Sequence, residues 1–126
     1  MEKIKLPGAP EPVGHYSSAV VHNGLIFVSG QLPRDAVTDR VETGAIEAQT
    51  ELALRNVEAI LIAAGSDLNH VLQFTIYVSE MDDWDKVNAV YARILGEHKP
   101  ARAIVPVKDL HFDTKIEIQA IAAVKE

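Results

Sequence analysis

The two residues best suited to chemistry, an arginine and a glutamate, lie in the C-terminal quarter of the chain. Arg102 stands at the start of an apolar, strand-like run, directly after a loop fixed by Pro100. An arginine there presents a planar fork of N–H donors that matches a carboxylate or a phosphate. On spacing alone, a salt bridge at the rim of the fold is the simpler role for this side chain.

Glu117 lies inside the apolar segment 115–122. A carboxylate with such neighbours costs free energy unless it is paired or used, and carboxylates in such settings often have functional roles. The alternative is an ordinary position on an edge strand, with the side chain facing solvent. The pattern leaves both interpretations open.

Two further segments place polar residues at the border of apolar elements. One strand-like run ends at Ser29 and Gly30, and a glycine at a strand end often exposes backbone amides to a ligand. Asn88 falls one helical turn after Trp84, at the border of an apolar stripe. Without other support, a strand-end turn and a helix-surface amide are the simpler interpretations.

Motifs of other chemistries are missing. The sequence contains no G-x-S-x-G elbow, no phosphate-binding G-x-x-x-x-G-K-[ST] loop and no G-x-G-x-x-G turn. It has no cysteine, and its histidines show neither H-x-H nor H-x-x-x-H spacing. We therefore expect no metal site, no cofactor and no disulfide. The histidines are His15, His22, His70, His98 and His111.

The hydrophobic pattern predicts five strands and two helices. The strands are expected at residues 18–22, 25–29, 71–79, 103–107 and 115–124. The helices are expected at 45–64 and 83–95. Asn23 and Gly24 form the turn of a hairpin, and Gly65 and Gly96 end the helices. Asp82 or Asp83 is expected to cap the second helix.

This β-β-α-β-α-β-β order predicts an α/β (α+β) fold in one domain, residues 1–126, with both helices on one face of a mixed sheet. The second helix should bury a stripe made of Trp84, Val87, Tyr91, Ile94 and Leu95. The opposite sheet face mixes polar and apolar residues, which suits partial burial against other subunits or the solvated face of an open sheet. That face carries Gln73, Thr75, Tyr77, Glu117, Gln119, Ile121 and Ala123.

Composition limits the partners of the chain. Its 126 residues include 18 acids and 12 bases, which give a net charge of −6. No basic tract is present, which argues against a nucleic-acid partner. No apolar run reaches the roughly 18 residues that a membrane span needs, and the N-terminal segment lacks the pattern of a signal peptide. We therefore expect a cytoplasmic protein.

Short segments spread along essentially the whole chain resemble the RidA/YjgF family in order and spacing. The most diagnostic are 27–31 (F-V-S-G-Q) and 100–102 (P-A-R). The resemblance implies a chorismate-mutase-like fold, a homotrimer whose sheets pack into a central barrel, and active sites between subunits. The other matching segments are 14–20, 32–33, 49–50, 56–61, 64–66, 87–91 and 116–118.

The resemblance also implies a reaction. The expected activity is a cofactor-free deaminase that hydrolyses 2-imino or 2-enamino acids, such as 2-iminobutanoate and 2-iminopropanoate, to 2-oxo acids and ammonia. Arg102 matches the residue that binds the substrate carboxylate, and Glu117 matches the one that holds the attacking water. The positions that match the pocket lining are Tyr16, Ser29, Gly30, Asn88 and the backbone of Ile104.

The sequence departs from the family pattern at three positions. Ile104 replaces a small hydroxyl or thiol residue, Pro106 replaces a polar residue, and Gln119 replaces a second glutamate. Ile104 and Pro106 make the expected pocket wall more apolar and stiffer. One alternative is therefore a deaminase for a larger enamino acid from pyrimidine or aromatic breakdown. Another is a role without this chemistry, as a regulator that binds small carboxylates or as an RNA-acting inhibitor of translation.

Overall fold

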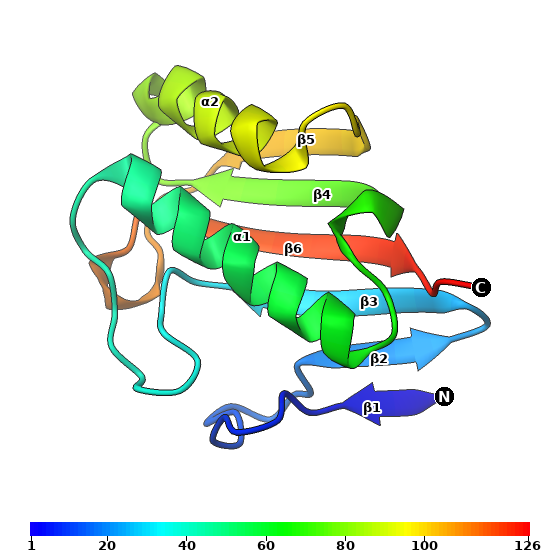
Figure 1. Ribbon diagram of the computed structural model, residues 1–126. Coiled ribbons are helices and arrows are strands. Elements are labelled where there is room, and N and C mark those ends of the chain that lie inside the picture. Colours follow the sequence, from blue (N-terminus) through cyan, green and yellow to red (C-terminus); the bar gives the residue numbers. More distant parts are fainter.

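One mixed sheet of six strands lies beneath two helices in the computed structural model, which describes residues 1–126 (Figure 1). The strands lie side by side in the order β1-β2-β3-β6-β4-β5, and only the β4–β5 pair is parallel. The helices are α1 (Ile46–Ala63) and α2 (Trp84–Leu95). The strands are β1 (Glu2–Ile4), β2 (Ala19–His22), β3 (Leu25–Gln31), β4 (Val71–Val78), β5 (Ala101–Pro106) and β6 (Ile116–Ala123).

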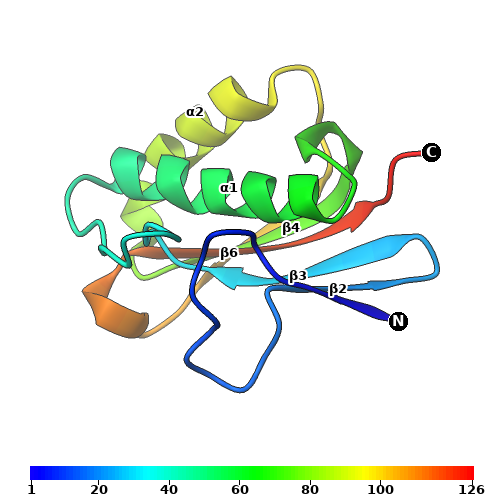
Figure 2. The same ribbon diagram turned by 60° about the horizontal axis from the view of Figure 1, so that its bottom comes forward.

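Both helices cover the same face of the sheet, as predicted (Figure 2). The core lies between the two layers, where apolar side chains of α1 and α2 meet those of β3, β4 and β6. Strand β6 alternates strictly, with its even-numbered residues from Ile116 to Ala122 buried beneath the helices. Its odd-numbered residues, including Glu117, therefore lie on the opposite, open face.

Two buried amides fix the loops that flank the open face. Gln49 of α1 donates to the Gly44 carbonyl and accepts a hydrogen bond from the backbone N–H of Lys115, both across an N···O distance of 3.0 Å or less. Asn56 donates to the carbonyls of Leu32 and Arg34 at 3.1 and 2.7 Å. Buried amides need such partners. They anchor the chain directly after β3 and directly before β6.

The predicted helix ends are confirmed. Gly65 and Gly96 have φ values of +86° and +63°, a region that favours glycine directly after a helix. The predicted cap of α2 is wrong, because Asp83 makes no side-chain capping hydrogen bond. It continues a short 3-10 turn, Met81–Asp83, and has helical dihedral angles, whereas a capping residue needs an extended backbone.

Three other predictions need correction. Strand β1 was not expected, since three residues of which two are charged carry no alternation signal. Strand β3 does not end at Ser29 but continues to Gln31 through a shift of register after Val28, so Gly30 lies inside the strand. Trp84 is not part of the buried stripe of α2. Its side chain is 37% exposed, because it stands at the first turn of the helix.

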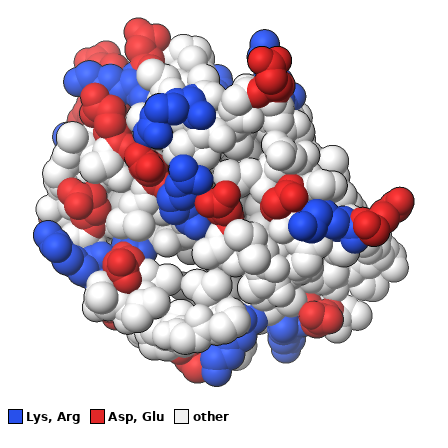
Figure 3. Space-filling view, viewed as in Figure 1, with Lys and Arg blue, Asp and Glu red and all other residues white.

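The helix-covered face carries charges of both signs. Figure 3 shows lysine and arginine side chains interspersed with aspartate and glutamate over this side of the molecule. This face therefore presents no continuous basic surface of the kind that binds a nucleic-acid backbone. Neither α1 nor α2 combines the length and the hydrophobicity that a membrane-crossing helix requires.

Candidate functional site

Arg102 is held in place by side chains of α2. It lies on the edge strand β5, in register with Phe74 of β4, and so on the helix-covered side of the sheet. Its Nη1 donates to Oδ1 of Asn88 at 2.8 Å. The guanidinium carbon lies 4.7 Å from the ring centre of Tyr91 and 5.5 Å from that of Trp84, which are cation–π distances. An arginine fixed in this way keeps its remaining N–H donors for a ligand.

Tyr91 lies between Arg102 and the hydrophobic core. Its ring packs edge-on against Phe74, with the centroids 5.4 Å apart. Its hydroxyl is buried and has no hydrogen-bond partner in the chain. Burial raises the pKa of Tyr91, and the positive charge of Arg102 opposes part of this rise. We call the group formed by Arg102, Asn88, Tyr91, Trp84 and the neighbouring Ile104 the arginine half-site.

Glu117 occupies the open face of the sheet, next to Gly30 of β3. A Cβ atom at Gly30 would overlap the Glu117 carboxylate, so only glycine leaves room for it in this position. Burial raises the pKa of Glu117 above its ordinary range, and the charge of His111 opposes part of this rise. A carboxyl group with a raised pKa is suited to accept and return a proton near neutral pH.

Ser29 and Tyr16 lie near the same end of β3. The Ser29 hydroxyl donates to the Ser17 carbonyl at 2.6 Å, which joins β3 to the segment that carries Tyr16. Tyr16 is 56% exposed and lines a small cavity together with Gly30, although neither Glu117 nor Ser29 lines that cavity. We call Glu117, Gly30, Ser29 and Tyr16 the carboxylate half-site.

The two half-sites lie on opposite faces of one sheet. Arg102 shares the helix-covered face with Phe74, whereas Glu117 shares the open face with Tyr77, its partner on β4. Strand β4 also separates β5 from β6. A single copy of the chain therefore does not bring Arg102 and Glu117 together around one small substrate. None of its salt bridges includes either residue.

Every residue expected in the site falls in one of the two half-sites. Ile104 lies in register with Ile76, and its partly buried side chain packs against the hydrophobic core. Pro106 is exposed at the end of β5, and Gln119 accepts a hydrogen bond from the Tyr77 hydroxyl at 2.9 Å.

Three functional neighbours were not identified from the sequence. The sequence places Tyr91 and Trp84 in the buried stripe of the second helix, and it marks His111 only as a histidine without metal-ligand spacing. Only the fold places the first two beside Arg102 and the third near Glu117. Trp84 and Tyr91 lie four residues before and three residues after Asn88, and this helical spacing was the one sequence signal that could have placed them beside it.

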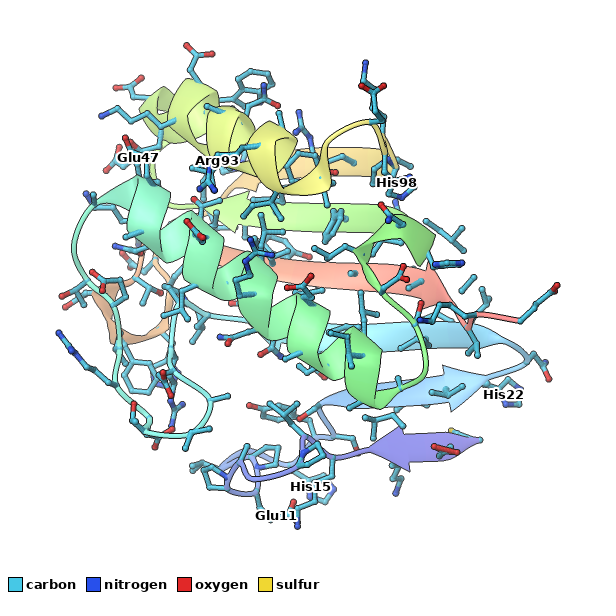
Figure 4. The ribbon with its side chains drawn as sticks, viewed as in Figure 1. Glu11, His15, His22, Glu47, Arg93 and His98 are labelled. Carbon is cyan, nitrogen blue, oxygen red and sulfur yellow. The ribbon has the colours of Figure 1, made fainter.

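Figure 4 shows His15, His22 and His98 on separate parts of the molecule. No three His, Asp or Glu side chains converge where they could hold a metal ion.

Comparison with known proteins gives consistent matches along the chain. A family model described as "Endoribonuclease L-PSP" matches residues 7–124. The RutC family protein PH0854 of Pyrococcus horikoshii is 46% identical over 121 residues, which are 96% of this chain and 96% of that protein.

Solved structures of two Escherichia coli proteins share the fold. The YjgF gene product is 36% identical, with a TM-score of 0.92, and the match covers 99% of this chain and 100% of that chain. TdcF, solved with bound serine, is 32% identical with the same TM-score and the same coverage of both chains. With the match of the family model over nearly the whole length, these findings show that the chain belongs to the YjgF/RidA family.

Proposed function

We propose that the protein hydrolyses 2-imino and 2-enamino acids to 2-oxo acids and ammonia, at sites that form between copies of the chain. One observation carries this proposal. An arginine and a carboxylate, neither paired with an opposite charge, lie on opposite faces of the sheet and each lacks the other. The bound serine in TdcF supports a carboxylate ligand, because serine is itself an amino acid.

The chemistry requires few groups. Arg102 binds the substrate carboxylate through two parallel N–H···O bonds and so fixes the C=N group near the carboxylate half-site of the neighbouring copy. Glu117 holds a water and accepts its proton as the water oxygen attacks the electrophilic imine carbon. The tetrahedral carbinolamine then collapses. With a protonated imine as the starting species, the carboxyl returns its proton to the nitrogen. The carbinolamine O–H then gives its proton to Glu117 as the C–N bond breaks, and ammonia and a 2-oxo acid leave.

Gly30 and the aromatic residues have supporting roles in this scheme. Gly30 leaves the space that the Glu117 carboxylate and its water occupy. Asn88 and Tyr91 hold the guanidinium in one orientation, which limits the entropy lost when a substrate binds. The raised pKa makes the Glu117 carboxylate a stronger base than an ordinary glutamate, so it is better suited to accept the proton of the attacking water.

A trimer is the first expected result. The open face carries Phe27, which is 44% exposed, and the half-buried Ile121, its neighbour on β6. A sheet face of this kind is suited to pack against copies of itself, and a closed ring of three heterologous contacts would bring an arginine half-site to each carboxylate half-site. Native mass spectrometry at micromolar concentration should give three chains per particle. A monomer would contradict the proposed site.

Changing Gly30 to alanine should separate folding from function. The backbone of Gly30 does not have a positive φ, so alanine fits the strand without backbone strain. Its methyl group would push the flexible Glu117 carboxylate aside. We expect a folded protein whose rate of imine hydrolysis is reduced at least about 10-fold, because a small misplacement of a catalytic group has effects of this order or larger. Thermal unfolding and activity should be measured together, and full activity in a folded variant would rule out this role for Gly30.

A coupled assay tests the reaction itself. A threonine or serine dehydratase releases the unstable imine, semicarbazide traps part of it, and the free 2-oxo acid is measured with and without this protein. The proposal predicts faster formation of free 2-oxo acid when the protein is present. An unchanged rate would favour a second function, the binding of small carboxylates without chemistry, for which the bound serine in TdcF is the supporting observation.

A further inference from the structure

A second cavity adjoins Arg102 on the side away from Glu117. It has a volume of about 470 Å3 and lies between the C-terminal half of α2 and the segment that leads into β5. Small-molecule sites commonly have volumes of this order. Asn88, Tyr91 and Arg102 of the arginine half-site line the cavity, but the proposed reaction gives no role to the rest of its lining, which includes Lys99.

The charged residues of the cavity are all basic. Arg102 and Lys99 line it together with His98, and no aspartate or glutamate does. Neither Lys99 nor Arg102 takes part in a salt bridge, although the chain as a whole has a net charge of −6. Unpaired cations that share a concave site favour an anionic ligand.

Tyr91 adds an independent sign of a ligand. It lines the same cavity and is only 7% exposed, yet its hydroxyl has no hydrogen-bond partner. A buried hydroxyl left unpaired costs free energy, and phenylalanine would avoid this cost while it kept the ring against Arg102. The oxygen itself has almost no accessible surface, so a small shift of the ring would bring the hydroxyl to a polar ligand group in the cavity.

The wall opposite α2 is held in place by backbone and side-chain contacts. Nε2 of His98 donates to the carbonyl of Val71 at 2.8 Å, which ties the segment after α2 to the start of β4 (Figure 4). The backbone N–H groups of Gly96 and His98 donate to the carbonyls of Ala92 and Leu95. These bonds satisfy two of the last carbonyls of α2. The end of the helix still carries a partial negative charge, which Arg102 and Lys99 must outweigh for an anion to bind.

We propose that this cavity receives the far end of the substrate and selects 2-imino acids with a second carboxylate. This inference rests on the proposed function, because Arg102 must hold the first carboxylate at the mouth of the cavity. The second carboxylate then lies beside Lys99 and accepts a hydrogen bond from the Tyr91 hydroxyl. The protein should thus prefer acidic imines to short monocarboxylic ones, which Arg102 still binds through their single carboxylate.

The test compares two 2-oxo acids as stable product analogues. 2-Oxopentanoate and 2-oxoglutarate have carbon chains of equal length and differ only at the far end, which is a methyl group in one and a carboxylate in the other. Calorimetric titration of the wild-type protein should show 2-oxoglutarate binding about 10-fold more tightly, the effect of one charge-assisted hydrogen bond. Lys99→Met should remove this preference, and Tyr91→Phe should reduce it. Lys86→Met is the matched control, because Lys86 lies on α2 outside the cavity.

The outcomes separate this inference from the proposed function. Equal binding of the two acids by the wild-type protein would overturn the assignment of the cavity and leave the proposed reaction standing. The assignment also fails if Lys86→Met and Lys99→Met reduce the preference equally, because the effect would then come from net charge. If neither acid binds, both the cavity assignment and the role of Arg102 are wrong.

Discussion

Replacing Glu117 with glutamine should lower the rate of imine hydrolysis about 100-fold or more, the usual effect of losing a general base. The amide keeps the shape of the side chain but is a poor proton acceptor. Binding of a 2-oxo acid should persist, because Arg102 is intact on the other face of the sheet. Steady-state rates from the coupled assay, with Glu80→Gln as an exposed control, measure this effect.

The same substitution has an expected effect on pH dependence. The wild-type kcat/KM should fall on the acid side, with an apparent pKa above the ordinary glutamate range, because Glu117 must be ionised to accept a proton and burial raises its pKa. The glutamine variant should lack this acid limb. Normal rates and an unchanged pH profile in the variant would show that Glu117 is only a strand residue.

The Glu117→Gln variant should lose activity but not thermal stability at neutral pH. The folded protein holds the Glu117 proton more tightly than the unfolded chain does, because burial raises the pKa in the folded state. This group therefore contributes stability at low pH that is lost as the pH rises through the raised pKa. At neutral pH the glutamine variant should unfold at the same temperature as the wild type or at a higher one, which thermal unfolding at two pH values would detect.

Replacing Arg102 with lysine should weaken the binding of small 2-oxo acids about 10- to 150-fold, because a charge-assisted hydrogen bond contributes roughly 1.5–3 kcal/mol. Lysine keeps the charge but loses the planar fork. It also lacks the geometry that lets Nη1 reach Asn88 while other N–H groups stay free. Activity should fall with affinity, whereas Glu117→Gln should lose activity alone.

Titration of pyruvate or 2-oxobutanoate by calorimetry or NMR decides the role of Arg102. Arg93→Lys is a suitable control, because Arg93 also lies on the helix-covered side but pairs with Glu51 on the surface, with an N···O distance of 2.8 Å. If Arg102→Lys binds these acids as well as the wild type does, Arg102 is not the carboxylate ligand. It would then be a structural residue that packs on Tyr91 and Trp84.

The sequence predicted most of the fold because its signals are local. The Asn23-Gly24 turn, the glycines after both helices and the strict alternation of β6 are each read within a few residues, and the structure confirms them. Strand β1 had no such signal, because it is short, largely charged and paired only with β2. Its existence depends on contacts with a strand some 15 residues away, as the pairing of Ile4 with Ala19 shows.

The site was less predictable, since its geometry depends on which sheet face each residue occupies. The pattern indicated that Glu117 lies on the open face but gave no face to Arg102, whose strand is short and mixed. The register of β5 against β4 decides this, and it places Arg102 over Tyr91 instead of beside Glu117. The unpaired Tyr91 hydroxyl is equally invisible in the sequence, where tyrosine at helical spacing indicates a core residue.

Mixing the two variants tests the central claim, that Arg102 of one copy and Glu117 of another form one site. Arg102→Lys and Glu117→Gln chains should be produced together, so that they assemble at random. In a ring of identical heterologous contacts, about one contact in four would then combine an intact arginine with an intact glutamate. The co-assembled protein should regain about a quarter of the wild-type rate of imine hydrolysis, which each variant alone lacks. A mixture that is no more active than its two components would contradict a shared site.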